Sequence, residues 1–216
     1  MQHRVLDEQP ASRHKQDEIL SVNPSNGIER ITIFESMPWK EELHSLIDQL
    51  ASTTLSLECD EDDKSDFIAE RALIYSAFVA RLLIDAKKTT DPISGHNISV
   101  GVISNKLESP EHVQPLLRRF PERDYYDFEN EVVQPVSCRR ILNQIIHSFI
   151  IPTFEVGEDG TILGFFVASD QSANDKLYHV KLESWIGYLE SIANDDITTM
   201  EARFDQDKGK WIETRR

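Results

Sequence analysis

The hydrophobic pattern of this 216-residue chain changes its period at Pro152, and this change constrains the fold more than any other feature. Before Pro152, apolar residues recur at the three- and four-residue spacing of helices that bury one face. After Pro152, short runs of β-branched and aromatic residues alternate with turn residues, which is typical of strands. We therefore expect an α+β fold, in which an N-terminal helical layer packs on a C-terminal, mostly antiparallel sheet that carries one further helix.

The part that begins at Pro152, residues 152–216, is predicted to be rich in strands. Glu158, Asp159 and Gly160 separate two apolar runs, and this turn sequence favours a β-hairpin. A second hairpin is expected near the C-terminus. In chain order, the predicted elements are strands at residues 154–157, 162–169 and 177–181, a helix at 182–193, and strands at 197–204 and 210–214.

The part before it, residues 36–151, is predicted to be mainly helical. Pro38 suits the first turn of one helix, and the longest helix is expected at residues 63–88. The longest helix has a broad apolar stripe, which we expect to face the core. Its members are Phe67, Ile68, Ile74, Tyr75, Phe78, Val79, Leu82 and Ala86.

Arg71 lies within this apolar stripe. A guanidinium group keeps its charge at any ordinary pH, so burying it without a polar partner is costly. We expect Arg71 to be largely buried and paired with a carboxylate from another segment, which is a structural role. The alternative is that its head group reaches a polar cleft and binds a ligand.

The remaining segments have weaker periodicity. Residues 1–27 are polar and are expected to form a mobile tail, which leaves residues 28–216 as a single domain. Residues 30–35 are compatible with a short strand. Residues 91–135 are expected to be loop-like apart from a strand at 98–104. Three aromatic residues are expected to anchor this segment, namely Tyr125, Tyr126 and Phe128.

Charge and composition exclude several classes of protein. The formal net charge of −15 opposes non-specific binding to duplex DNA. No run of 18 apolar residues occurs, so we expect no membrane span. With only two cysteines, Cys59 and Cys138, a disulfide framework is not expected, and a soluble protein of the reducing cytoplasm fits best.

Sequence motifs for nucleotides and metals are also missing. The chain contains no GxGxxG, no P-loop and no HExxH motif, and its seven histidines are scattered. The acidic run at residues 58–66 does not match a calcium-binding loop. Counted from Asp60, the sixth position is Ser65 and not the glycine of the sharp turn, and the twelfth is Arg71 and not the glutamate that binds the ion. We expect neither a cofactor nor a metal ion.

Residues 137–150 are predicted to form an amphipathic helix that Ser137 caps and Pro152 ends. Arg140, Asn143 and His147 fall together on the side opposite the apolar stripe. Such a polar side has two interpretations. It is either one wall of a catalytic or binding site, or the solvated back of an ordinary amphipathic helix.

The spacing of Arg140 and His147, with Asn143 between them, resembles the Arg-x4–6-His motif of the HEPN superfamily. Many members of that superfamily are metal-independent ribonucleases that act as dimers. The resemblance implies that His147 exchanges a proton with a ribose 2′-hydroxyl and that Arg140 stabilises the charge on phosphate. It also implies that Asn143 helps to position the phosphate.

The leading functional prediction is an acidic, non-catalytic interaction protein, a subunit or accessory factor of a larger assembly such as a bacterial or phage defence system. The expected partner is a protein, and neither duplex DNA nor a membrane is expected. The alternative is a HEPN-like, metal-independent ribonuclease that uses Arg140 and His147 in a homodimer and acts on RNA.

Overall fold

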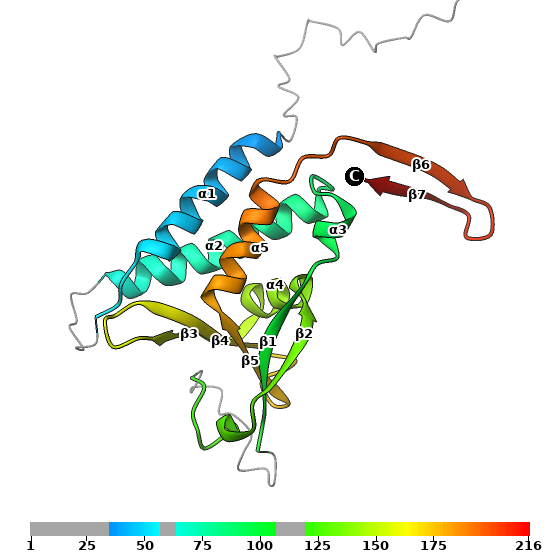
Figure 1. The fold of residues 1–216 in the computed structure, drawn as a ribbon. Coiled ribbons are helices and arrows are strands. Elements are labelled where there is room, and N and C mark those ends of the chain that lie inside the picture. The colour runs from blue at the N-terminus through cyan, green and yellow to red at the C-terminus, as the bar shows by residue number, and fades with distance from the viewer. Residues whose placement is uncertain (1–34, 57–63, 107–119) are drawn as a thin grey trace, which may run out of the picture. The chain divides into compact units, whose positions relative to one another are not determined.

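In the computed structural model, which describes residues 35–56, 64–106 and 120–216, five strands form the main sheet in the order β2-β1-β5-β4-β3 (Figure 1). Every neighbouring pair in this sheet is antiparallel. The strands are β1 (Asn97–Ser104), β2 (Val132–Ser137), β3 (Ser148–Val156), β4 (Ile162–Ser169) and β5 (Lys176–Lys181).

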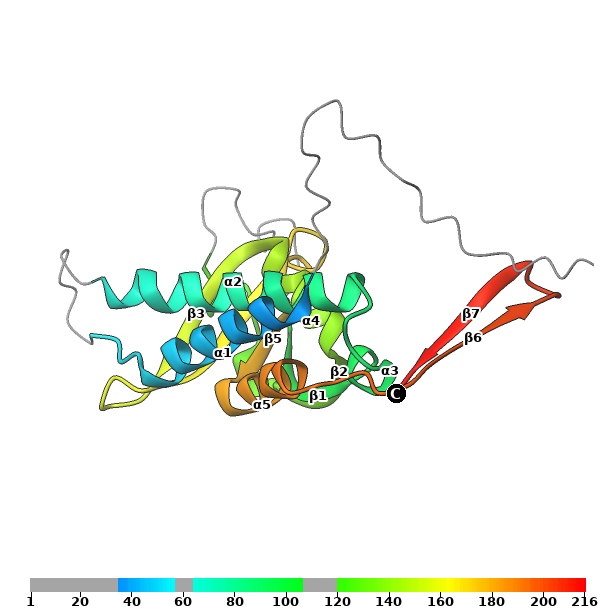
Figure 2. The same cartoon turned by 90° about the horizontal axis from the view of Figure 1, so that it is seen from above.

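Helices lie against one face of this sheet. The helix α5 (Leu182–Ala193) and the shorter α4 (Cys138–Ile146) pack on β4, α1 (Ser36–Ser52) packs on α5, and α2 (Ser65–Asp85) packs on α1 and α4 (Figure 2). Trp185 of α5 is fully buried and meets Phe165 of β4 edge to face. The structure thus confirms the predicted α+β fold, with a helical layer on an antiparallel sheet.

The opposite face of the sheet has its own apolar cluster. Phe165 and Phe166 are adjacent on β4, so their side chains point to opposite faces. On the face of Phe166, Tyr126 is fully buried, and Tyr125 and Phe128 pack beside it. Phe128 begins a short 3-10 helix, Phe128–Asn130. The predicted anchoring role of these three aromatic residues is confirmed.

The hairpin between β3 and β4 also forms as predicted. Gly160 has a φ of +82°, a conformation that side chains disfavour, and a Cβ atom there would lie 2.6 Å from the Leu55 carbonyl oxygen. The Leu55 N–H donates to the Gly160 carbonyl. This turn therefore joins the hairpin to the segment that follows α1.

One strand, β2, lies where the pattern predicted a loop. Strand β1 was expected at residues 98–104, but β2 falls inside the segment interpreted as loop. Pro135 lowers the strand propensity of β2, yet β2 is an edge strand, where a missing N–H is tolerated. A four-residue helix, α3 (Asp91–Ser94), precedes β1. Strands therefore begin well before Pro152.

The helix that contains Arg140 is shorter than predicted. It ends at Ile146, His147 is its C-cap, and β3 begins at Ser148. Ser148 pairs with Ser169 of β4, so the residues that follow His147 belong to the sheet and not to the helix. Pro152 lies inside β3, which is the other edge strand, so it does not end the helix.

The predicted core face of α2 is wrong. Val79 of the predicted stripe is buried, but the rest of the buried row comes from another side of the helix, while Phe67 is 64% exposed and Phe78 is 49% exposed. Small side chains allow the neighbouring helices to approach closely, and this packing outweighs the larger apolar area of the aromatic face. The buried row comprises Ala69, Ala72, Leu73, Ser76, Ala77, Val79, Ala80, Leu83 and Ile84.

The prediction that Arg71 is buried and paired with a carboxylate fails for the same reason. Arg71 lies on the exposed face, and its guanidinium donates to Gln49 Oε1 of α1 at 2.7 Å. Its partner is a neutral amide. Arg71 is therefore a surface residue that links α1 and α2.

Beyond α5, the strands β6 (Met200–Asp205) and β7 (Lys210–Arg215) form a separate two-stranded sheet, as the sequence predicted. Arg215 holds this sheet to α3, because its guanidinium contacts Asp91 Oδ1 at 2.6 Å. The predictions for residues 1–27 and for most of 30–35 and of the acidic run lie outside the described residues. No helix within the described ranges is long and apolar enough to cross a membrane.

Candidate functional site

The predicted site residues Arg140, Asn143 and His147 all line one cavity of about 780 Å³ beside α4. Arg81 of α2 contributes a second cationic wall, and Asp170 of the turn after β4 faces it with an opposite charge. The polar side of α4 borders a concavity, in which Arg140 and His147 are exposed and Asn143 is half-buried.

Local structure at the start of α4 fixes the position of Arg140. The Ser137 hydroxyl accepts a hydrogen bond from the Arg140 N–H at 3.3 Å, which confirms the predicted N-cap. The Arg140 guanidinium lies 6.0 Å from the centre of the Tyr178 ring. Within the described part of the chain, no carboxylate lies within ion-pair distance of Arg140.

Arg81 is held by two partners. Its guanidinium donates to Asn143 Oδ1, and its Nε lies 2.6 Å from Asp85 Oδ2. Arg139 contacts the second oxygen of Asp85 at 2.7 Å. Although burial alone would raise the pKa of Asp85, hydrogen bonds from Arg81 and the charges of both arginines hold it below its usual value. Asp85 thus offsets part of the positive charge at this edge of the cavity.

Gln144 ties the cavity wall to the sheet. Its buried Oε1 accepts a hydrogen bond from the Ser169 N–H at 2.8 Å and another from the Ser172 hydroxyl. These contacts join α4 to the turn after β4, from which Asp170 lines the cavity. The sequence did not single out Gln144, because an amide on a helix carries no motif.

A smaller groove of about 240 Å³ continues from Asn143 and His147 along α2. Its apolar walls are Phe78, Leu82 and Ile146. This groove joins the polar cavity to the exposed apolar row of α2. The outer sides of α2 and α4 therefore form one continuous surface.

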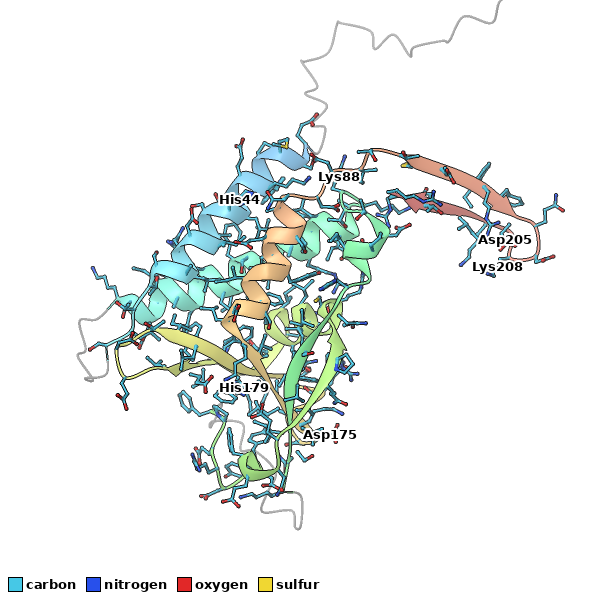
Figure 3. All side chains as sticks on the ribbon, in the orientation of Figure 1. His44, Lys88, Asp175, His179, Asp205 and Lys208 are labelled. Carbon is cyan, nitrogen blue, oxygen red and sulfur yellow. The ribbon has the colours of Figure 1, made fainter. Side chains whose placement is uncertain are left out.

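A second polar cluster lies on the sheet, on the face away from the helices, and the sequence did not reveal it. His179 of β5 is buried, with Nδ1 3.1 Å from Glu131 Oε1 and Nε2 3.0 Å from Glu155 Oε2 (Figure 3). Because ionised carboxylates only accept hydrogen bonds, both contacts are satisfied when both ring nitrogens carry protons. Lys181 donates to the same Glu155 oxygen at 2.7 Å.

Two glycines make room for this cluster. Gly101 pairs with His179 across β1 and β5, and a Cβ atom on Gly101 would lie 1.7 Å from Glu131 Oε1. Gly164 of β4 pairs with Glu155, and a Cβ atom there would meet His179 Nε2 at 3.3 Å. The cluster thus spans β1, β5, β4 and β3, and Glu131 joins it from the position just before β2. Its members are too far apart in sequence for any motif to reveal them.

Cys138 at the start of α4 is buried. Burial raises the pKa of Cys138 to about 12, so its thiol stays protonated at neutral pH. Within the described ranges, no group of three histidine, cysteine or acidic side chains is arranged to hold a metal ion.

Comparison of the chain with protein-family models, with curated proteins and with solved structures found no match.

Proposed function

We propose that this protein is a non-catalytic interaction protein that binds a partner protein through the outer face of α2. The observation that carries the proposal is the row of exposed apolar side chains on this helix, including Phe67, Ile74 and Phe78. Monomeric proteins rarely expose contiguous large apolar patches, and such patches mark interfaces. The protein would act as a subunit or accessory factor of a larger assembly.

The face has the anatomy of a protein interface. Tyr75 and Phe78 stack with ring centres 6.4 Å apart, Arg71 lies within the exposed row, and Arg81 lies beside it. Aromatic and arginine side chains are the residues that most often dominate binding energy. The groove lined by Phe78, Leu82 and Ile146 supplies a recess for an apolar anchor from the partner.

A comparison of three purified proteins tests this proposal. The wild type, a Phe67→Ser/Phe78→Ser variant and a Val133→Ser control would be used to isolate partners from cells of the source organism, followed by reconstitution from pure components. Val133 is 69% exposed on β2, away from the face. We expect the wild type and the control to form a stoichiometric complex that the double variant does not form. A complex that the double variant retains in full would contradict the proposal.

A second candidate function is the HEPN-like ribonuclease that the sequence resembles, and the shared cavity of Arg140, Asn143 and His147 favours it. His147 would take the proton of a ribose 2′-hydroxyl, whose oxygen attacks the adjacent phosphorus. The 5′-oxygen of the next nucleotide leaves with the proton that the protonated His147 returns to it, and a 2′,3′-cyclic phosphate remains. Arg140 would stabilise the charge that develops on the phosphate oxygens.

Single-stranded RNA incubated with the protein in the presence of a metal chelator tests this second function. We expect cleavage by the wild type and by a His44→Ala control, since His44 lies on α1 away from the cavity (Figure 3). The His147→Ala and Arg140→Ala variants would lose activity with unchanged folding. The absence of cleavage by the wild type, or equal cleavage by His147→Ala, would contradict the ribonuclease proposal.

A further inference from the structure

We infer that the partner on the outer face of α2 is a second copy of this chain, packed antiparallel along that helix about a two-fold axis near Tyr75. The inference rests on the interaction face proposed above and adds the identity of its occupant. Three observations carry it, namely the spacing of the exposed row, the distribution of charge along the helix, and the position of the groove.

The exposed row has the spacing of a helix-pairing seam. Phe67, Arg71, Ile74 and Phe78 follow one another at intervals of four, three and four residues. This alternation keeps large side chains on one line of a helix, where a second helix can interlock with them. The buried row of α2 already meets α1 and α4, so this seam is a second packing surface of the same helix.

The charges beside the seam favour an antiparallel copy. Glu70 and Arg81 lie on the same flank of α2, about three turns apart. In an antiparallel pair each flank meets the same flank of the other helix, and a two-fold axis near Tyr75 brings each Glu70 close to Arg81 of the second copy. In a parallel two-fold pair each flank would instead meet the opposite flank, so Glu70 and Arg81 would lie on different sides of the seam and could not pair.

Glu70 has a specific reason to favour a cationic neighbour. Burial, followed by the charge of Asp66, raises the pKa of Glu70 above its usual value. An arginine from a second copy would relieve this penalty, as opposite charges favour the ionised form. The acidic end of one helix therefore complements the arginine end of the other.

The groove lies where this register needs a recess. With the axis near Tyr75, Phe67 of the second copy falls beside Leu82, at the groove that Phe78 and Ile146 also line. Phe67 is among the most exposed apolar side chains of the described residues, and a recess of about 240 Å³ suits an aromatic ring. Because the pair is symmetric, one Phe67 side chain would insert into a groove at each end of the seam, and the two insertions would bury the seam.

Net charge does not prevent this association. Each copy carries a formal charge of −15, but charges more than about 8 Å apart are largely screened at physiological ionic strength. The contact is centred on apolar side chains, whose attraction does not weaken with added salt. We therefore expect added salt to preserve or strengthen the dimer.

Sedimentation equilibrium on two complementary variants tests the inference. In Glu70→Arg, two arginines would meet at each of the two symmetric contacts of a self-pair, and in Arg81→Glu two glutamates would meet there. We expect each variant alone to self-associate about tenfold more weakly than the wild type, and an equimolar mixture to recover most of the affinity. Circular dichroism would confirm that both variants are folded.

The outcomes separate this inference from the proposed function. A wild type that stays monomeric at roughly 100 µM, a concentration that detects weak pairing, would overturn the second copy as occupant and leave the face open to a different protein. A mixture that associates no better than its components would overturn the antiparallel register. If Arg81→Glu does not fold, the Phe67→Ser variant, which changes an exposed side chain, replaces it as the test. Dimerisation of Phe67→Ser as strong as that of the wild type would overturn the inference.

Discussion

The sheet face that carries His179 and the outer face of α2 differ in how their side chains are satisfied. On the sheet, Glu131 and Glu155 contact the two ring nitrogens of His179, and Gly101 and Gly164 leave room for these contacts. On α2, Phe67 and Phe78 have no comparable cover from the described residues. The fold thus surrounds the buried His179 with internal partners, while α2 carries a row of exposed apolar side chains on its outer face. The first region should govern stability and the second association.

Removal of the imidazole should have the largest effect on stability. His179→Ala leaves Glu131 and Glu155 facing each other without the group between them, which we expect to cost about 3 kcal/mol of unfolding free energy. His44→Ala on α1 is the control and should stay within about 0.5 kcal/mol of the wild type. Urea denaturation followed by circular dichroism measures both. Equal stability of the two variants would show that the cluster has no structural role.

Filling the space beside the cluster should have the next largest effect. In Gly101→Ala the new methyl group overlaps the Glu131 side chain, so the carboxylate loses its contact with His179. We expect a loss of about 1–3 kcal/mol. The matched control is Gly187→Ala in α5, where a Cβ atom meets nothing within 4 Å and helix propensity should stabilise by up to about 1 kcal/mol. A melting temperature that rises in both variants would contradict the account.

Acid should weaken the sheet region through Glu155. Burial alone would raise the pKa of this carboxyl, but hydrogen bonds from Lys181 and His179 lower it below 4.5. Because the folded pKa is lowered, the contribution to stability is present above pH 4.5 and is lost as the pH falls through the folded value. Glu155→Gln should therefore show a shallower loss of stability in acid than the wild type. Identical pH profiles would show that the pairing contributes nothing.

Substitution on the outer face should have the smallest effect on stability. Arg71 is exposed and donates to a neutral amide, so Arg71→Ala should cost no more than about 0.5 kcal/mol. If Arg71 were buried and paired with a carboxylate, the same substitution would cost about 3–5 kcal/mol of unfolding free energy. Thermal unfolding of this variant beside His179→Ala compares the two regions directly. A loss of similar size in both would mean that the outer face also contributes to the core.

Much of the fold follows from local patterns. The β3–β4 hairpin, the bounds of β4, the Ser137 cap and the amphipathic α5 depend on residues close in sequence, and all form as predicted. The edge strand β2 escaped prediction because Pro135 is unfavourable in strands except at an edge, and strand order is not a local property.

The errors in α2 and the sites have a different origin. Both faces of α2 are apolar, and periodicity cannot decide whether its alanines or its aromatic residues face the core. Arg140, Asn143 and His147 could be placed on one side of a helix, but the cavity needs Arg81 from α2 and the turn after β4. The His179 cluster joins residues 131, 155 and 179, which only the sheet register brings together.

The central claim is that the outer face of α2 serves association and not folding, and Phe67→Ser tests it most directly. Sedimentation equilibrium and thermal unfolding would be measured on the same preparations, with Val133→Ser as the control. We predict that Phe67→Ser weakens self-association at least about tenfold, that its melting temperature stays within about 2 °C of the wild type, and that the control changes neither quantity. A melting temperature that falls steeply, or a self-association that does not change, would contradict the account.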